Sequence, residues 1–170
     1  MKKLVLVYGG IAGFVIICIN TLSFEMGVGH AWLGFLVMFI AFSSIFIAIK
    51  QYRDEALGGV IRFGTAFLLG FYLTVVASFV YVLVWEIYLA MTDYAFVDAY
   101  IASIIESRQA SGASPADLAA TVAETDAFRQ NYASALFRLP MTFVEIFPVG
   151  ILVSLVAALI LRNRKVLAAG

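Results

Sequence analysis

Residues 61–91 of the chain read IRFGTAFLLGFYLTVVASFVYVLVWEIYLAM, and this stretch decides the fold. Its only strongly charged residues are Arg62, near the start, and Glu86, near the end. At ~1.5 Å per residue a helix of this length extends about 46 Å, which exceeds the ~30 Å hydrocarbon core of a bilayer. The stretch therefore predicts a membrane-spanning helix that either tilts or emerges from the hydrocarbon region.

The composition of the whole chain also favours a membrane protein. The 170 residues are 64% hydrophobic and 13% charged, and the mean hydropathy is +1.01. A water-soluble globule of this size lacks the polar surface to cover so many apolar side chains. The length suits a single domain, residues 1–170, and the net charge of zero gives no reason to expect nucleic-acid binding. The one cysteine, Cys18, excludes an intramolecular disulfide and a cysteine zinc cluster.

Three further apolar segments are predicted spans. Residues 4–22 follow two lysines, but the run is too long for a signal peptide and no small-x-small cleavage site follows it, so we expect a retained helix. Residues 32–49 and 139–161 are the other two, and residues 50–62 are predicted to form a charged loop after the second span. Small residues recur at helical spacing on all four spans and would let neighbouring helices approach closely. They are Gly9 and Gly13; Gly34, Ala41 and Ala48; Gly70, Thr74 and Ser78; and Gly150, Ser154 and Ala158.

The only long polar segment, residues 92–138, is predicted to form a helical hairpin. Its apolar residues fall at helical spacing in two blocks. These are Val97, Tyr100, Ile101, Ile104 and Ile105, and then Leu118, Val122, Thr125, Phe128, Tyr132 and Leu136. Between the blocks, residues 111–113 predict a turn. Ser114, Pro115 and Asp117 then predict a helix start with a serine N-cap, proline at the first position and a capping box that uses aspartate.

The distribution of basic residues predicts the orientation. Eight of the 11 lysines and arginines fall at one side of the predicted spans, and the other three lie within residues 92–138. The eight are Lys2, Lys3, Lys50, Arg53, Arg62, Arg162, Arg164 and Lys165. By the positive-inside rule both termini are cytoplasmic. We therefore expect an all-α membrane protein: a bundle of four transmembrane helices with an extracytoplasmic helical hairpin between the third and fourth.

Several short motifs resemble a known family. They are Tyr52-Arg53-Asp54, Gly58-Gly59, Ile61-x-Phe63-Gly64-x-Ala66 and Tyr81-x-x-x-Trp85-x-Ile87-Tyr88. Together they resemble the bacterial family named domain of unknown function 4199, and the last span, with Glu145, Gly150, Ser154 and its basic end, is similar to that of the family. The resemblance covers nearly the whole chain. It implies a small four-span protein of the bacterial cytoplasmic (inner) membrane, and because the family has no assigned activity it implies no catalytic residue.

Ionisable residues concentrate at the predicted outer ends of the spans, where Glu25, His30, Glu86, Arg138 and Glu145 form a candidate polar cluster. A charged side chain at the centre of a membrane helix costs ~2.5–3.5 kcal/mol, so the two glutamates within spans need an explanation. One interpretation is that Glu86 and Glu145 face the interior and share hydrogen bonds or a proton with His30, Arg138 or water. The alternative is that each acid is interfacial and is capped by a neighbouring helix or pairs with Arg138 to fix helix register.

Two other groups of residues are candidate sites. His30 together with Glu25, Glu86 and Glu145 offers donors that suit divalent ions, but no His-x-x-x-His or Glu-x-x-His spacing is present, and we expect neither a metal nor a cofactor. Tyr52, Arg53 and Asp54 form a candidate cytoplasmic contact, either with a partner or with lipid head groups. In the alternative, Arg53 pairs with Asp54 or caps a helix C-terminus.

Two classes of function are consistent with the sequence. The first is a non-catalytic membrane protein that acts through partner binding or self-association. The alternative is an oligomeric proton- or cation-linked transporter or channel that uses Glu86 and Glu145. An enzyme is the weakest reading because no nucleophile and base pair is recognisable. The expected partners are membrane lipid and either a second copy of the chain or another membrane protein.

Overall fold

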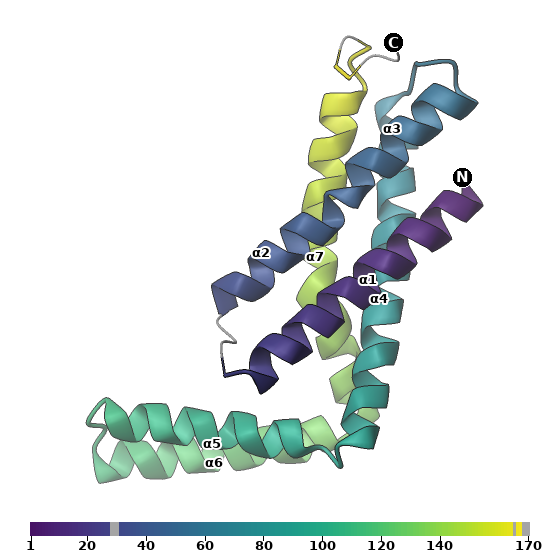
Figure 1. The fold of residues 1–170 in the computed structure, drawn as a ribbon. Coiled ribbons are helices and arrows are strands. Elements are labelled where there is room, and N and C mark those ends of the chain that lie inside the picture. Colours follow the sequence, from purple (N-terminus) through teal and green to yellow (C-terminus); the bar gives the residue numbers. More distant parts are fainter. Residues whose placement is uncertain (28–30, 165, 168–170) are drawn as a thin grey trace. The chain divides into compact units, whose positions relative to one another are not determined.

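The computed structural model of the chain describes residues 1–27, 31–164 and 166–167. Within these residues the regular secondary structure is entirely α-helical (Figure 1). The helices are α1 (Lys2–Glu25), α2 (Ala31–Phe42), α3 (Ser44–Ala56), α4 (Phe63–Met91), α5 (Ala95–Ala110), α6 (Pro115–Ala133) and α7 (Ala135–Leu161). They divide between two compact units. Unit 1 comprises Met1–Val84 and Phe143–Gly170, and unit 2 comprises Trp85–Thr142.

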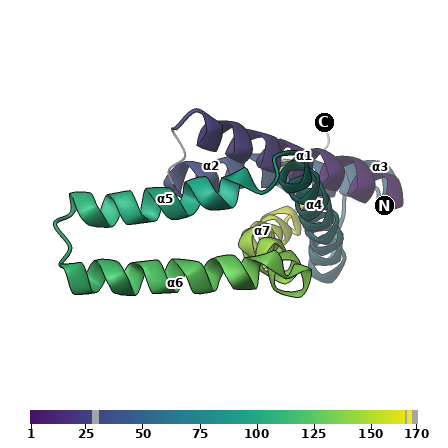
Figure 2. The same cartoon turned by 90° about the horizontal axis from the view of Figure 1, so that it is seen from below.

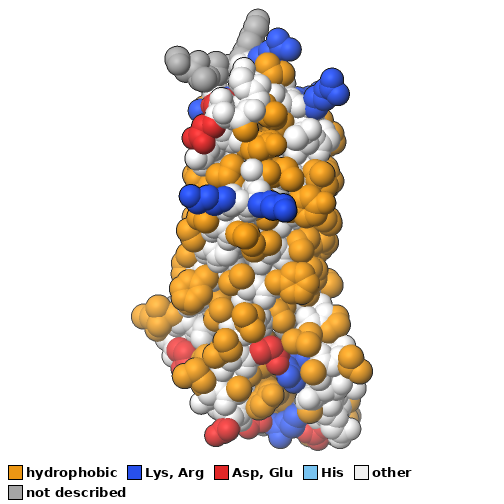
Figure 3. Space-filling model, turned by 90° about the vertical axis from the view of Figure 1, so that its right-hand side faces the viewer, with side chains coloured by type: hydrophobic (Ala, Val, Ile, Leu, Met, Phe, Trp, Pro, Cys, Tyr) orange, Lys and Arg blue, Asp and Glu red, His pale blue; other side chains and the backbone are white. Residues whose placement is uncertain are grey.

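Four helical segments are long and apolar enough to cross a membrane. They are Lys2–Glu25, Trp32–Ala56, Phe63–Met91 and Ala135–Leu161. Figure 3 shows that hydrophobic side chains dominate much of the face that it draws. The predictions of an all-helical chain and of four apolar helices of membrane-spanning length are therefore confirmed.

The second apolar segment is built from two helices, α2 and α3, that are separated only by Ser43. The Ser43 hydroxyl donates to the Ile40 carbonyl at 2.6 Å and so satisfies a backbone acceptor next to the break. The helix continues to Ala56, whereas we expected Lys50–Arg62 to be a loop, and that prediction was wrong for residues 50–56.

Side-chain pairs at i, i+4 spacing stabilise these last two turns of α3. Lys50 Nζ lies 2.7 Å from Asp54 Oδ2, and Gln51 Nε2 donates to Glu55 Oε1 at 3.0 Å. Pairs at this spacing face each other only on a helix, so the charged residues extend α3 rather than end it. The turn that follows contains Gly58-Gly59, whose φ angles of 64° and 86° are readily adopted only by glycine.

Helix α1 packs against α4 through two glycines. A Cβ atom at Gly9 would lie 2.7 Å from the Leu73 carbonyl oxygen, and one at Gly13 would overlap the carbonyl of Ala77. The GxxxG pair predicted on the first span is therefore a helix contact in which two backbones approach closely.

Helices α4 and α7 meet within unit 1 through their small residues. A Cβ atom at Gly70 would lie 2.7 Å from Ser154 Oγ, and the hydroxyl groups of Thr74 and Ser154 lie 3.3 Å apart. Thr74 donates to the Gly70 carbonyl at 3.0 Å and Ser154 donates to the Gly150 carbonyl at 2.7 Å. Because each hydroxyl is satisfied by the carbonyl four residues earlier, the two helices pack closely without leaving these polar groups unpaired.

Unit 2 contains the last turns of α4, the hairpin of α5 and α6, and the first turns of α7. Helix α4 ends after Met91, and Asp93 and Tyr94 adopt left-handed conformations with φ of 46° and 60°. Two successive non-glycine residues in this region stop the helix, so α4 does not continue into α5. No Pro or Gly marks this break in the sequence.

Helices α5 and α6 run antiparallel beside each other (Figures 1 and 2). Arg129 Nη2 lies 2.9 Å from Asp98 Oδ1, and the rings of Tyr100 and Phe128 have centroids 6.1 Å apart. The predicted N-cap is confirmed: Asp117 N donates to Ser114 Oγ at 3.2 Å, and Ser114 N donates to Asp117 Oδ2 at 3.3 Å. Of the residues predicted to share one face in the second block, Thr125 and Tyr132 are buried, whereas Val122 and Leu136 are exposed.

The hairpin interface uses small polar residues in place of some predicted aliphatic ones. In α6 the buried side chains are Thr121, Thr125 and Tyr132, whereas Val122 is 41% exposed. Both threonines bond to carbonyls of their own helix, with Thr121 donating to Asp117 O at 2.9 Å and Thr125 donating to Thr121 O at 3.0 Å. Because each hydroxyl is hydrogen-bonded within α6, these threonines can be buried without leaving a polar group unpaired.

Candidate functional site

Glu86 and Arg138 form a bidentate ion pair in unit 2. Arg138 Nε donates to Glu86 Oε1 and Nη2 donates to Glu86 Oε2, both at 2.7 Å. The Arg138 side chain is 5% exposed and that of Glu86 is 26% exposed, so the pair is largely shielded from solvent. Paired, parallel N–H···O bonds of this kind are the strongest that a guanidinium makes with a carboxylate.

Arg138 also caps the end of α6. Its Nη1 donates to the carbonyl oxygens of Tyr132 at 2.8 Å and Ala133 at 3.3 Å, which belong to the last turn of that helix. The guanidinium carbon lies 5.3 Å from the ring centroid of Tyr94 and 5.8 Å from that of Tyr132. A cation placed at a helix C-terminus and over aromatic faces is favourable on both counts. Arg138 thus ties the end of α4 to the end of α6.

Aromatic side chains position this ion pair. Trp85, next to Glu86 on α4, is 8% exposed and donates from Nε1 to the Tyr132 hydroxyl at 2.8 Å. The Trp85 ring also packs edge-on against Phe96, with centroids 4.7 Å apart. Because Tyr132 contacts both Trp85 and Arg138, the same residue of α6 fixes both neighbours. The Glu86–Arg138 ion pair therefore lies in a packed, hydrogen-bonded cluster of aromatic side chains.

Glu145 has a different setting, within unit 1. Tyr81, on α4, is 4% exposed and donates from its hydroxyl to Glu145 Oε1 at 3.0 Å. Glu145 itself is exposed at the surface of the chain. This differs from the interpretation in which Glu145 faces the interior. It leaves a carboxylate on the outer surface of an apolar helix, with one tyrosine beside it.

The remaining members of the predicted polar cluster are Glu25 and His30. Glu25 is the last residue of α1, and His30 lies outside the described residues. In the part of the chain that is described, no three His, Cys, Asp or Glu side chains come together as a metal site would need. Of the five predicted residues, the structure thus brings Glu86 and Arg138 together and places Glu145 beside Tyr81.

The second predicted site, Tyr52-Arg53-Asp54, lies in the last turns of α3. The Arg53 side chain is only 1% exposed, and its Nε donates to Asp54 Oδ1 at 2.7 Å. Its other nitrogens donate to backbone carbonyls at the end of the chain, with Nη1 2.9 Å from the Val166 oxygen and Nη2 bonded to the Leu167 oxygen. This matches the alternative in which Arg53 pairs with Asp54. The guanidinium anchors the segment that follows α7.

These positions can be compared with known families. A family profile described as a protein of unknown function (DUF4199) matches residues 7–163 of the chain. The chain belongs to this family. The DUF4199 match includes Arg53, Glu86, Arg138 and Glu145, and it confirms the resemblance inferred from the short motifs. No curated protein and no solved structure matches this DUF4199 chain.

Two residues of this DUF4199 protein were missed as parts of a site by the sequence reasoning. Tyr81 was assigned only to a motif, although it lies four positions before Trp85, so both side chains lie on one face of α4. Tyr132 was assigned only to the apolar face of α6. Its hydroxyl and carbonyl oxygens, which accept from Trp85 and Arg138, give no signal in the sequence.

Proposed function

We propose that this DUF4199 protein is a non-catalytic integral protein of the bacterial cytoplasmic membrane that acts by binding a second copy of itself or another membrane protein. Both termini lie in the cytoplasm and the α5–α6 hairpin lies outside it. The orientation rests on the positive-inside rule. Within unit 1, the supporting residues are those at the start of α1, at the end of α3, before α4 and after α7, namely Lys2, Lys3, Lys50, Arg53, Arg62, Arg162 and Arg164.

The observation that carries the proposal is the side chain of Glu145, an exposed residue within an apolar helix. Glu145 lies ten residues after the start of α7, about 15 Å along a helix that is about 40 Å long. At the centre of a membrane helix a charged side chain costs ~2.5–3.5 kcal/mol, which is the upper bound for Glu145 facing lipid. A carboxylate has about four acceptor positions, and Tyr81 provides one donor. A neighbouring transmembrane segment that covers Glu145 and donates to it would remove most of that cost.

The surface that continues from Glu145 along α7 is suited to such a contact. Leu152, Val156 and Leu159 share its side of the helix, at spacings of seven, four and three residues, and are 52%, 42% and 51% exposed. A polar group surrounded by apolar side chains gives a helix contact both area and a fixed register. We call Glu145, Leu152, Val156 and Leu159 the α7 outer face.

Cysteine cross-linking in native membranes tests the proposal. In a Cys18→Ser background, Leu152→Cys and Val156→Cys should form cross-linked products under oxidation, either at twice the monomer mass or with an identified membrane protein. Leu6→Cys is the matched control, because Leu6 is also exposed, at 63%, but lies on α1. If no position on the α7 outer face cross-links more than Leu6→Cys does, the proposal is refuted.

The orientation has its own test. Ser111 is exposed at the tip of the hairpin and Leu57 is exposed after α3, so single cysteines at these positions report on opposite sides. A membrane-impermeant maleimide should label Ser111→Cys in intact cells and Leu57→Cys only after permeabilisation. The reverse pattern would invert the proposed topology, and equal labelling of both would exclude it.

A second candidate function, an oligomeric proton- or cation-linked transporter, is favoured by the same carboxylate within an apolar helix. Glu86 is the weaker candidate for such a role, because both of its oxygens are bound to Arg138. Proteoliposome flux measurements distinguish the two functions. Proton or cation flux that is lost in Glu145→Gln and retained in Glu106→Gln, an exposed acid of α5, would favour transport over binding.

A further inference from the structure

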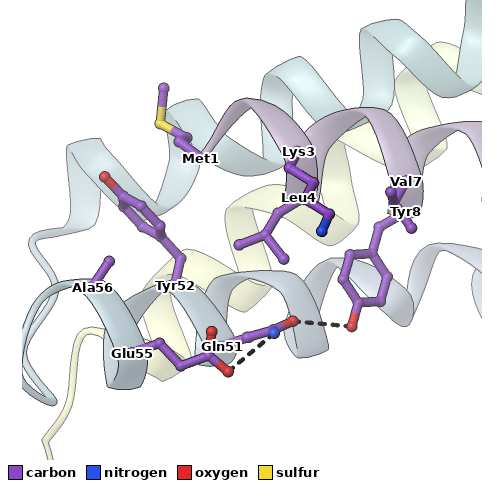
Figure 4. Close-up of a pocket in the computed structure, with 9 residues that line it drawn as sticks. All are labelled: Met1, Lys3, Leu4, Val7, Tyr8, Gln51, Tyr52, Glu55 and Ala56. Carbon is purple, nitrogen blue, oxygen red and sulfur yellow. Dashed lines mark hydrogen bonds between the residues drawn. The ribbon is translucent and has the colours of Figure 1, made fainter.

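A hollow of about 460 Å³ lies in unit 1 between the first two turns of α1 and the last turns of α3. Figure 4 shows the residues that line it, which include Lys3, Leu4, Val7 and Tyr8 from α1 and Gln51 and Glu55 from α3. Its volume falls within the range of small-ligand pockets. None of the functions considered above uses this hollow.

The polar side of the hollow is ordered by a chain of hydrogen bonds. The Tyr8 hydroxyl donates to Gln51 Oε1 at 3.1 Å, and Gln51 Nε2 donates to Glu55 Oε1 at 3.0 Å (Figure 4). This chain fixes the orientation of the Gln51 amide and holds the Glu55 carboxylate beside it. A carboxylate that accepts one hydrogen bond retains acceptor positions for a cationic ligand.

Two side chains of opposite charge line the hollow. Lys3 contributes an ammonium from α1, and Glu55 contributes a carboxylate from α3; both side chains are exposed. In Figure 4 Lys3 extends from α1 toward α3. Leu4 and Val7 supply apolar surface on the same helix, and Val7 is 46% exposed. A complementary ligand carries one anionic group, one cationic group and an apolar portion.

We propose that this hollow binds a phospholipid with a phosphoethanolamine head group. The phosphate lies against the Lys3 ammonium, the primary ammonium of the head group donates to Glu55, and an acyl chain follows Leu4 and Val7. The proposal rests on the membrane placement proposed above. It replaces the general expectation of membrane lipid as a partner with one specific lipid, bound from the leaflet that faces the cytoplasm.

The position of the hollow along α1 suits a head group. Lys3 is the second residue of α1, and Tyr8 lies five residues further, about 7.5 Å along the helix. A lysine at the end of a spanning helix extends its ammonium toward the head-group region, and a tyrosine is favoured at the boundary with the hydrocarbon. The hollow thus covers the depth at which a phosphate and the first part of an acyl chain lie.

The balance of charge selects among phospholipids. A phosphoglycerol head group carries a net negative charge without a cation, so Glu55 repels it while Lys3 attracts it. A phosphocholine head group carries both charges, but its quaternary ammonium has no N–H group to donate to the carboxylate. Of these three head groups, only phosphoethanolamine satisfies both Lys3 and Glu55 with charge-assisted hydrogen bonds.

Native mass spectrometry of the full chain tests the assignment. The protein is purified from membranes in mild detergent and is then mixed with equimolar phosphatidylethanolamine, phosphatidylglycerol and phosphatidylcholine of identical acyl chains. We expect phosphatidylethanolamine adducts to dominate. Glu55→Gln should lower the ratio of phosphatidylethanolamine to phosphatidylcholine adducts about tenfold, as expected for the loss of a hydrogen bond to a charged group. Lys3→Gln removes the contact with a phosphate that both lipids carry, so it should lower the adducts of both about tenfold.

The controls separate this site from general lipid attraction and from misfolding. Lys2→Gln removes the adjacent lysine, which does not line the hollow, and Glu106→Gln removes an exposed acid of α5. Both should retain the wild-type adduct ratio, and circular dichroism should show unchanged helicity in all four variants. An unchanged ratio in Glu55→Gln, or a wild-type preference for phosphatidylglycerol, overturns the lipid assignment while leaving the membrane placement intact. Recovery of the chain from the soluble fraction overturns both.

Discussion

Replacement of Arg138 with methionine should destabilise unit 2 by about 3 kcal/mol, near the lower end of the ~3–5 kcal/mol range for removing one partner of a buried ion pair. The variant loses the two 2.7 Å bonds to Glu86 and the 2.8 Å bond to the Tyr132 carbonyl. The Glu86 side chain is 26% exposed, so water reaches the carboxylate that is left behind and limits the loss. Methionine retains much of the apolar stem and so avoids an added packing defect.

A double-mutant cycle isolates the pair itself. We expect Glu86→Gln to cost about 2 kcal/mol and the double variant Glu86→Gln with Arg138→Met to cost about 3 kcal/mol, which is less than the sum of the single changes. The coupling energy is then about 2 kcal/mol, because the second change removes a charge that has already lost its partner.

Trp85 fluorescence provides the assay. In a Trp32→Phe background Trp85 is the only remaining tryptophan, and it donates to Tyr132 beside the ion pair. Denaturant titration in mixed micelles, followed at Trp85, therefore reports on unit 2. Arg129→Met is the matched control, because Arg129 pairs with Asp98 while both side chains are more than half exposed, at 52% and 70%. The reasoning is refuted if Arg138→Met costs no more than Arg129→Met, or if the coupling energy is zero.

Two further predictions concern unit 1. Gly13→Ala should displace α1 from α4 and lower the free energy of unfolding by about 2 kcal/mol, because the new Cβ overlaps the Ala77 carbonyl. Gly10→Ala is the control and should not destabilise the fold, because nothing lies within 4 Å of its Cβ. Thermal melts compare the two variants, and equal losses of stability would contradict the contact. Arg53→Met should release the segment after α7, so trypsin should cleave after Arg162 and Arg164 faster than in the wild type. The control is Arg62→Met, which replaces an exposed arginine before α4 and should leave the cleavage rate unchanged.

The features that could be predicted from the sequence are those with local causes. The N-cap of α6 depends on Ser114 and Asp117 alone, three residues apart, and it was predicted with its capping box. The four apolar helices follow from runs of hydrophobic residues. The pairing of Glu86 with Arg138 was one of two interpretations. It followed from the predicted positions of both residues near the outer ends of their spans, where their opposite charges lie at a similar depth.

Other features depend on contacts that the sequence does not display. Arg53 was expected in an exposed loop, but its burial depends on backbone carbonyls more than 100 residues away, which any residue type can provide. Whether the third span continues into the hairpin was left open, because no glycine or proline marks the break at Asp93 and Tyr94. The extension of α3 to Ala56 did have a signal, since Lys50 and Asp54 are spaced as a helical ion pair, but their charge suggested a loop.

The hydroxyl groups of Thr74 and Ser154 affect how the protein is made. Each bonds to a carbonyl of its own helix, so α4 and α7 both present these groups already satisfied before they meet. Each helix can therefore form without its partner and leave neither hydroxyl unpaired. Residues 92–134 are synthesised between the two helices, so α4 is complete before α7 has emerged from the ribosome. The contact between α4 and α7 can therefore form after a delay, because neither hydroxyl needs the other helix as a hydrogen-bond partner.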